Sequence, residues 1–145
     1  MSLNPFARWY RLPVADRRAM WPASWRLACV RLLLATRGLK ASQARLARSS
    51  PASTRTMEHP DAWQARLRAL QRISRHLPAT RCLARSLTLW WWMRMEGLAP
   101  QLRIGVDRAA GILEGHAWVE CDGHLFDETR AGAERWTRMD VPFQR

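Results

Sequence analysis

The spacing of apolar residues changes once along this chain, close to Gly97. Before that point apolar side chains recur at steps of three and four residues, which is the period of an amphipathic helix. This pattern predicts helices over 25–38, 41–47, 61–76 and 82–96. After it, apolar and polar residues alternate as in strands, which predicts strands over 102–106, 112–120 and 125–129. Helices followed by a small antiparallel sheet indicate an α+β fold, with the N-terminal helices and the 82–96 helix packed on the sheet.

Local signals mark the ends of the first helix. Ser24 is its expected N-cap and Gly38 its expected end. Apolar residues surround most of the circumference, so we expect this helix to be buried. The chain after 130 offers Trp136 and Phe143 as anchors and shows no clear element.

A hairpin is the most specific local prediction. Asp122-Gly123 between alternating apolar residues is typical of a two-residue turn. With that turn, His116 and Asp127 fall on the same face of the hairpin, within side-chain reach. A three-residue turn would place Glu128 opposite His116 instead, which makes Glu128 the alternate carboxylate.

The chain has three cysteines, and Cys82 falls in the first turn of its predicted helix. Unpaired N–H groups at a helix start stabilise a thiolate and can hold an oxyanion. We expect Cys29 to be inert within its helix and Cys121 to be partly exposed at the hairpin turn. A cysteine at a helix start is more often a packing residue than a nucleophile. With a strand histidine and a same-face carboxylate, however, the three residues Cys82, His116 and Asp127 predict a nucleophile, its base and the group that orients the base.

The composition is strongly basic, with a formal net charge of +12 that comes almost entirely from arginine, because Lys40 is the single lysine. This charge favours acidic partners such as nucleic acid, an anionic membrane surface or an acidic peptide. The arginines of the 61–76 helix are expected mainly to form a solvated face, with a partner-binding surface as the alternative. Because adjacent helical residues point about 100° apart, we expect at least one of Trp90, Trp91 and Trp92 to line a groove or contact a partner.

A length of 145 residues predicts a single domain. Residues 1–77 form its helical N-terminal part, 78–129 carry the catalytic motifs, and 130–145 are a C-terminal tail. The apolar stretch 27–35 is too short to span a membrane and contains Arg31. With an odd number of cysteines and no signal peptide, the sequence predicts a cytoplasmic protein with reduced thiols and no membrane association.

Several short blocks of the C-terminal half occur together. They are Arg81-Cys82-Leu83-Ala84-Arg85-Ser86-Leu87, Leu102-Arg103-Ile104-Gly105-Val106, and Gly115-His116-Ala117-Trp118-Val119-Glu120 followed by Asp122-Gly123. In this combination the chain resembles the stand-alone transglutaminase-like cysteine peptidases of lasso-peptide biosynthesis, over about 78–129. The resemblance implies a transglutaminase-like or papain-like core that removes the leader from a ribosomally synthesised precursor. No cofactor and no metal are expected.

By this resemblance, Cys82 is the nucleophile and His116 the general base. The family commonly places its carboxylate twelve residues after the histidine, at Glu128. The wider transglutaminase-like hairpin ends on Asp-x-Thr, which Asp127-Glu128-Thr129 resembles, so Asp127 remains the first choice and Glu128 the alternate. The implied partners are the precursor's leader region, a separate leader-recognition protein that docks on the arginine-rich helical surface and the tryptophan cluster, and the ATP-dependent lasso cyclase.

Three other functions stay open. The same triad would serve a transglutaminase or a deamidase acting on glutamine, which differ only in the acyl acceptor. A basic nucleic-acid-binding module fits the charge and the tryptophans, but the arginines are spread over every segment and no nucleic-acid motif is present, so nucleic acid is not the expected partner. A metal site would use Cys82, His116, Cys121 and His124. The predicted register points Cys121 and His116 to opposite faces, which disfavours it.

Overall fold

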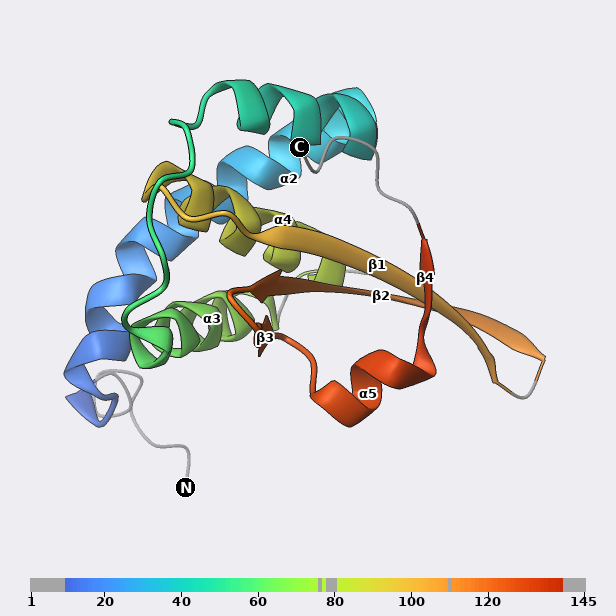
Figure 1. Cartoon of the computed structure of the whole chain (residues 1–145). Helices are drawn as coiled ribbons and strands as arrows, with labels where there is room; N and C mark the ends of the chain where they lie inside the picture. Colours follow the sequence, from blue (N-terminus) through green and yellow to red (C-terminus); the bar gives the residue numbers. More distant parts are fainter. Residues whose placement is uncertain (1–9, 76, 78–80, 110, 140–145) are drawn as a thin grey trace.

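The computed structural model of the chain describes residues 10–75, 77, 81–109 and 111–139. Within them lie the helices α2 (Val14–Arg48), α3 (Pro60–Ser74), α4 (Arg81–Met95) and α5 (Arg130–Arg135). The strands are β1 (Gln101–Ala109), β2 (Ile112–Cys121), β3 (His124–Phe126) and β4 (Thr137–Met139). Figure 1 shows α2, α3 and α4 gathered beside the sheet and the β1–β2 hairpin extending away from them. The predicted α+β class is confirmed.

Helix α2 is longer than the pattern predicted, because it begins at Val14 rather than near residue 25. The expected N-cap at Ser24 is wrong, since its hydroxyl donates to the carbonyl of Met20 inside the helix, at 2.8 Å. Pro22 removes one backbone donor but does not end the helix. The predicted end at Gly38 corresponds to a break, where φ is +73° and ψ is 176°, and a second helical segment continues to Arg48.

A long-range ion pair explains the early start of α2. Asp16, in its first turn, is fully buried beneath two arginines of α3. Arg68 Nη2 lies 2.9 Å from one carboxylate oxygen, and Arg72 contacts the other. The hydrogen bond from Arg68, opposed by burial and supported by Arg72, holds the pKa of Asp16 below its usual value. These two arginines therefore tie α2 to α3, while their side chains stay 46% and 30% exposed, so the expected solvated face also serves as a helix–helix contact.

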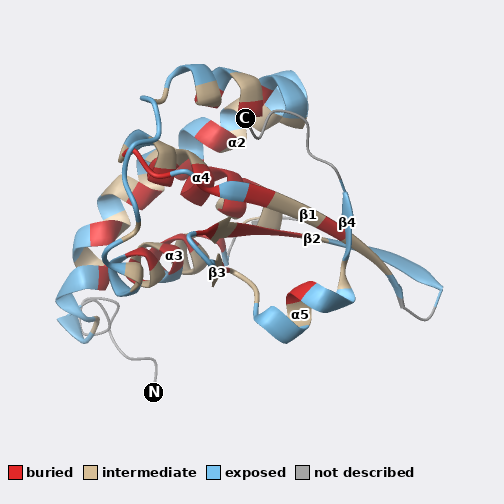
Figure 2. Ribbon diagram, viewed as in Figure 1, coloured by how far each residue is buried: buried red, intermediate tan, exposed pale blue. Residues whose placement is uncertain are grey.

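The expectation that the first helix is wholly buried is wrong for one of its faces. Ala23 and Val30 are buried completely in the core between α2, α3 and α4. Trp21 and Leu32, by contrast, are 76% and 66% exposed. Figure 2 shows the corresponding alternation of buried and exposed bands along α2. The helix thus has one core face and one apolar face that no described residue covers.

The three consecutive tryptophans of α4 all find neighbours in the described residues, and the expectation that one of them lines a groove or contacts a partner stays a prediction. Trp90 and Trp92 are buried. Trp91 is half-buried and meets Trp25 edge to face, with 5.9 Å between ring centroids. The guanidinium of Arg26 lies over both Trp25 and Trp92, 4.4 and 4.6 Å from their centroids. Packing on several sides of α4 thus accommodates side chains that point in different directions.

The sheet is antiparallel throughout, in the order β3-β2-β1-β4. Its β2–β3 register, with Cys121 opposite His124, confirms the predicted two-residue turn. The predicted continuation of β3 to residue 129 is wrong, because the strand ends at Phe126. Asp127 has a φ of +70°, which turns the backbone out of the extended conformation.

The segment after β3 contains structure that the sequence pattern did not predict. Thr129 caps α5 by accepting a hydrogen bond from the Gly132 N–H at 3.0 Å. Strand β4 then pairs with β1. Of the two expected anchors, Trp136 lies between α5 and β4, and Phe143 lies outside the described residues. None of the described helices is sufficiently long and apolar to cross a bilayer.

Candidate active site

Cys82 is the second residue of α4 and is half-buried. A hydrogen bond with the imidazole of His116 lowers the pKa of the Cys82 thiol, although burial opposes the thiolate. The backbone N–H groups of Ala117 and Leu83 also donate to the sulfur. Four features of the fold therefore meet at this atom: a helix start, an imidazole and two amides.

His116 lies on β2 and bonds in two directions. Its Nε2 is 2.9 Å from the backbone carbonyl oxygen of Asp127 and 3.5 Å from Oε2 of Glu128. Because Nε2 points at these two oxygens, Nδ1 is the nitrogen left to exchange a proton with Cys82. The bond with Cys82, and after it the Asp127 carbonyl and the Glu128 charge, raise the pKa of His116 against the effect of burial.

A buried hydrogen bond fixes the helix that carries Cys82 to the strand that carries His116. The Ser86 hydroxyl donates to the carbonyl of Ala117 at 2.8 Å. Ser86 lies one helical turn beyond Cys82 and so shares its face of α4. Since the N–H of Ala117 donates to the Cys82 sulfur, both backbone groups of Ala117 bind α4. The distance between the Cys82 thiol and the His116 imidazole is thus set by backbone as well as side-chain contacts.

The carboxylate of Asp127 does not face His116. It accepts hydrogen bonds from Arg85 Nε and, at 3.1 Å, from Gln71 Nε2. The left-handed φ of Asp127 is the reason, because it reverses the side-chain alternation on which the predicted contact depended. The expected contact between the Asp127 carboxylate and the imidazole is therefore absent. Its backbone carbonyl and the alternate carboxylate, Glu128, take that position.

Glu128 is held in place by donors from its own segment. The Trp136 indole N–H donates to Oε2 at 2.9 Å, and the Thr129 N–H donates to Oε1 at 2.7 Å. Burial favours the neutral acid, but these two bonds and the charge of His116 keep the pKa of Glu128 below its usual value. At Gly132, an added Cβ would overlap the carboxylate, with its carbon only 2.7 Å away. This position therefore requires glycine if Glu128 is to stay beside His116.

Two tryptophans enclose the imidazole. The ring of Trp118 is stacked on His116 with 6.1 Å between centroids, and that of Trp136 lies 5.4 Å away. Gly105, opposite His116 on β1, allows this approach, because a Cβ there would overlap Trp136 and lie 3.0 Å from the Trp118 ring. The sequence pattern did not predict that Trp136 contacts His116 and Glu128. A glycine inside a strand, Gly105, was the available signal, since it marks a close approach of other groups.

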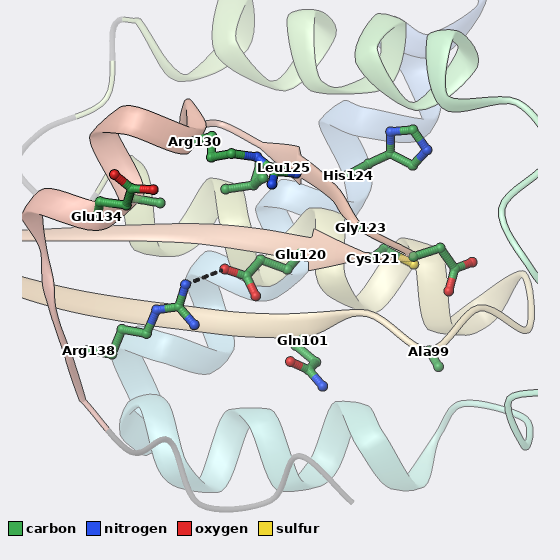
Figure 3. A pocket seen from close by; sticks show the side chains of 12 residues that line it. Ala99, Gln101, Glu120, Cys121, Gly123, His124, Leu125, Arg130, Glu134 and Arg138 are labelled. Atoms are coloured by element: carbon green, nitrogen blue, oxygen red, sulfur yellow. Dashed lines mark ion pairs between the residues drawn. The ribbon is translucent and has the colours of Figure 1, made fainter.

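The other two thiols and His124 lie away from the thiol–imidazole pair. Cys121 is buried, not partly exposed as expected, and burial raises the pKa of its thiol to about 11. Cys29, expected to be inert within its helix, is exposed on α2. His124 is exposed at the turn and lines a hollow of about 500 Å³ beside β2, which Figure 3 shows together with Cys121 and the Glu120–Arg138 ion pair. No group of three metal-ligating side chains occurs among the residues that the structure describes.

The family comparison agrees with this geometry. A family model described as the transglutaminase-like superfamily matches residues 18–141. Because this match covers well over half of the chain, the protein belongs to that superfamily, whose members are generally cysteine-dependent enzymes. Its fold and family indicate an activity of the cysteine peptidase or acyltransferase type. No curated protein and no solved structure matches the chain.

Proposed function

We propose that this protein is a cysteine peptidase that removes the leader from a lasso-peptide precursor. Cys82 is the nucleophile, His116 the general base and Glu128 the carboxylate that orients the base. The supporting observation is the hydrogen-bonded pair of Cys82 and His116, in which the pKa of the thiol is lowered and that of the imidazole is raised. The resemblance of the blocks around Cys82 and His116 to leader peptidases supports the substrate class.

The reaction uses the charges that this pair stabilises. The Cys82 thiolate attacks the scissile carbonyl carbon, and backbone N–H groups at the start of α4 stabilise the oxyanion. Protonated His116 then gives its proton to the leaving amine, and the first fragment departs. The neutral imidazole next takes a proton from water, the hydroxide attacks the thioester, and the thiolate returns. Glu128 and the Asp127 carbonyl hold Nε2–H through both half-reactions.

A second chain for leader recognition is part of this proposal. The exposed apolar face of α2, which includes Trp21 and Leu32, is the surface that we assign to that partner. Arg17 and Arg18 lie beside this face and suit an acidic partner. A double variant, Trp21→Ala with Leu32→Ser, should weaken partner binding and leave the Cys82 alkylation rate unchanged. Cleavage of precursor at full rate by the isolated protein, without measurable partner binding, would disprove this step.

Product mass tests the proposed reaction. The purified protein would be incubated with lasso-type precursors encoded in the same genome, with and without the leader-recognition protein. Peptidase activity predicts two fragments whose masses together exceed the precursor by one water. Cys82→Ala should abolish it, and Cys29→Ser, at an exposed thiol of α2, is the matched control that should retain it. Loss of ammonia from intact peptide, by cross-linking or deamidation, would instead identify an acyltransferase or deamidase of the same fold.

A further inference from the structure

A stretch of the β2 edge beside Cys82 carries backbone groups that no described residue pairs. Strand β3 pairs with β2 only over residues 119–121. At Ala117 the same edge binds α4, through the sulfur of Cys82 and the hydroxyl of Ser86. Over residues 112–115 no described strand or side chain adds to this edge, and Figure 1 shows that part of the hairpin extending away from the body of the protein.

The alternation of a strand determines which residues of β2 point their backbone N–H and C=O groups toward this edge. Cys121 closes the two-residue turn, so its N–H and C=O point toward β3. Every second residue of a strand points its backbone groups to the same side. Ala117 follows this parity, as its two bonds to α4 demonstrate, and so do Gly115 and Leu113. Those two residues therefore present free donors and acceptors on the line that leads to the Cys82 sulfur.

The side chains at this edge suit the approach of another polypeptide. Glycine inside a strand weakens it and often marks a place where a ligand or another backbone comes close. An added Cβ at Gly115 would meet only the Gly105 carbonyl oxygen, at 4.0 Å, so packing within this chain does not require glycine there. Leu113 shares its strand face with Ala117, and the residue is 64% exposed. Free backbone and an exposed apolar side chain thus lie together beside the nucleophile.

We propose that the substrate polypeptide binds this edge of β2 as an added strand, paired with Leu113 and Gly115, with the bond to be cleaved at Cys82. Ala117, whose N–H contacts the sulfur, lies about 7 Å from Gly115 along the strand. One or two further residues of an extended chain therefore bring a carbonyl carbon to the thiolate. Backbone pairing supplies affinity, and contact with Leu113 selects apolar side chains. The inference rests on the proposed peptidase function, since it assigns the substrate's place in that site.

Proline variants separate this edge from the rest of the sheet. In Leu113→Pro the lost N–H points outward, so the β1–β2 hydrogen bonds remain. Arg108→Pro is the matched control, because Arg108 is the cross-strand partner of Leu113 and its N–H points out of the opposite edge, beyond the residues that β4 pairs. Both changes would be made in a Cys29→Ser background to remove the exposed competing thiol.

Two series of electrophilic peptides of alanine and leucine serve as probes. Acetyl-tetrapeptidyl chloromethyl ketones test parallel pairing, and chloroacetyl-tetrapeptide amides test antiparallel pairing. In both, the Cys82 thiolate forms a carbon–sulfur bond as chloride leaves, so no peptidase activity is needed. The matched small reagent is chloroacetone for the chloromethyl ketones and chloroacetamide for the chloroacetyl peptides. The series whose strand direction fits the edge should alkylate Cys82 about tenfold faster than its small reagent, as one or two added hydrogen bonds predict. Leu113→Pro should abolish this acceleration and Arg108→Pro should retain it.

Equal rates for the peptides and the small reagents, or the same loss in both proline variants, would overturn the proposal. If Leu113→Pro also slows alkylation by the small reagents, the variant has disturbed Cys82 itself. Peptides with N-methylated backbone amides then serve as the test in place of the variant. If N-methylation leaves the rate of alkylation by the peptide unchanged, the proposal is overturned. A dimer that Leu113→Pro dissociates in sedimentation velocity would show that a second copy occupies the edge, which also overturns it. Failure of the proposed function is distinguishable, because peptide-dependent alkylation would persist while no peptide is hydrolysed.

Discussion

Replacing Glu128 by glutamine tests which carboxylate orients His116. The Oε2–Nε2 distance is 3.5 Å, and the two side chains are 15% and 20% exposed. Coulomb's law at this distance gives about 1 kcal/mol in water and about 5 kcal/mol at an effective dielectric constant of 20. Glu128→Gln should therefore slow the chemical step by roughly 5- to 5000-fold. The loss should stay below the ~10⁴-fold effect of a triad that loses its tautomer control, because the Asp127 carbonyl still accepts from Nε2.

The assay is the rate of Cys82 alkylation against pH in the Cys29→Ser background. In the parent, the lowered thiol pKa and the raised imidazole pKa extend the thiolate–imidazolium form to both lower and higher pH. Glu128→Gln removes a charge that raises the imidazole pKa, so the alkaline limit of this form should move to lower pH.

Asp127→Asn is the matched control for this experiment. Asparagine tolerates the left-handed φ of this position, and the backbone carbonyl that contacts His116 is kept. The variant leaves Arg85 without its carboxylate partner, so it should lower stability by about 1–3 kcal/mol while the alkaline limit stays in place. The reverse result, with the limit moved by Asp127→Asn and unchanged by Glu128→Gln, would refute the assignment of Glu128.

Three further changes test the supporting structure. Gly105→Ala should displace Trp136 and slow precursor cleavage at least about tenfold, with a changed near-ultraviolet dichroism from the tryptophans. Ser86→Ala leaves the Ala117 carbonyl without its donor and should cost about 1–2 kcal/mol in urea unfolding and slow Cys82 alkylation. Asp16→Asn should destabilise the fold by about 1–3 kcal/mol at pH 7. This is less than the cost of breaking a fully buried ion pair, because the Arg68 side chain is exposed to solvent. The pKa of Asp16 is lower in the folded than in the unfolded protein, where it is about 3.9. The ion pair of Asp16 therefore stabilises the fold above about pH 3.9, and this stabilisation is lost as the pH falls through the folded pKa. The stabilities of the variant and the parent should thus converge in acid.

Controls within the same elements separate these effects from general damage. Thr88→Val removes a hydroxyl that bonds only within α4 and should leave Cys82 alkylation unchanged. Asp61→Asn, at an exposed position in the first turn of α3, should keep the parent's loss of stability in acid. If Thr88→Val slows alkylation as much as Ser86→Ala, the bond to β2 is not what positions the cysteine. An acid profile of Asp16→Asn parallel to the parent's would contradict the role of its ion pair.

Local sequence determined the parts of this protein that depend on periodicity and turn chemistry. The helical and strand patterns predicted α3, α4 and β2 to within two residues, and the turn at Asp122-Gly123 predicted the pairing that follows it. The place of Cys82 in the first turn of α4 and that of His116 on its strand were predicted in the same way. These features follow from interactions among residues a few positions apart, which a sequence displays directly.

The start of α2 and the carboxylate that lies beside His116 depend on long-range contacts, so only the tertiary structure determined them. The start of α2 depends on Asp16 meeting two arginines of another helix, a pairing that no local pattern contains. That Glu128 lies beside His116, and the Asp127 carboxylate does not, depends on Asp127 entering a left-handed conformation, at a cost of about 1–2 kcal/mol. The ion pair of Asp127 with Arg85 and the bond of Glu128 to Trp136 stabilise that conformation from distant parts of the chain. Because a single change of backbone region reverses every following side chain, an otherwise correct register placed the Asp127 carboxylate beside His116, where the structure has Glu128.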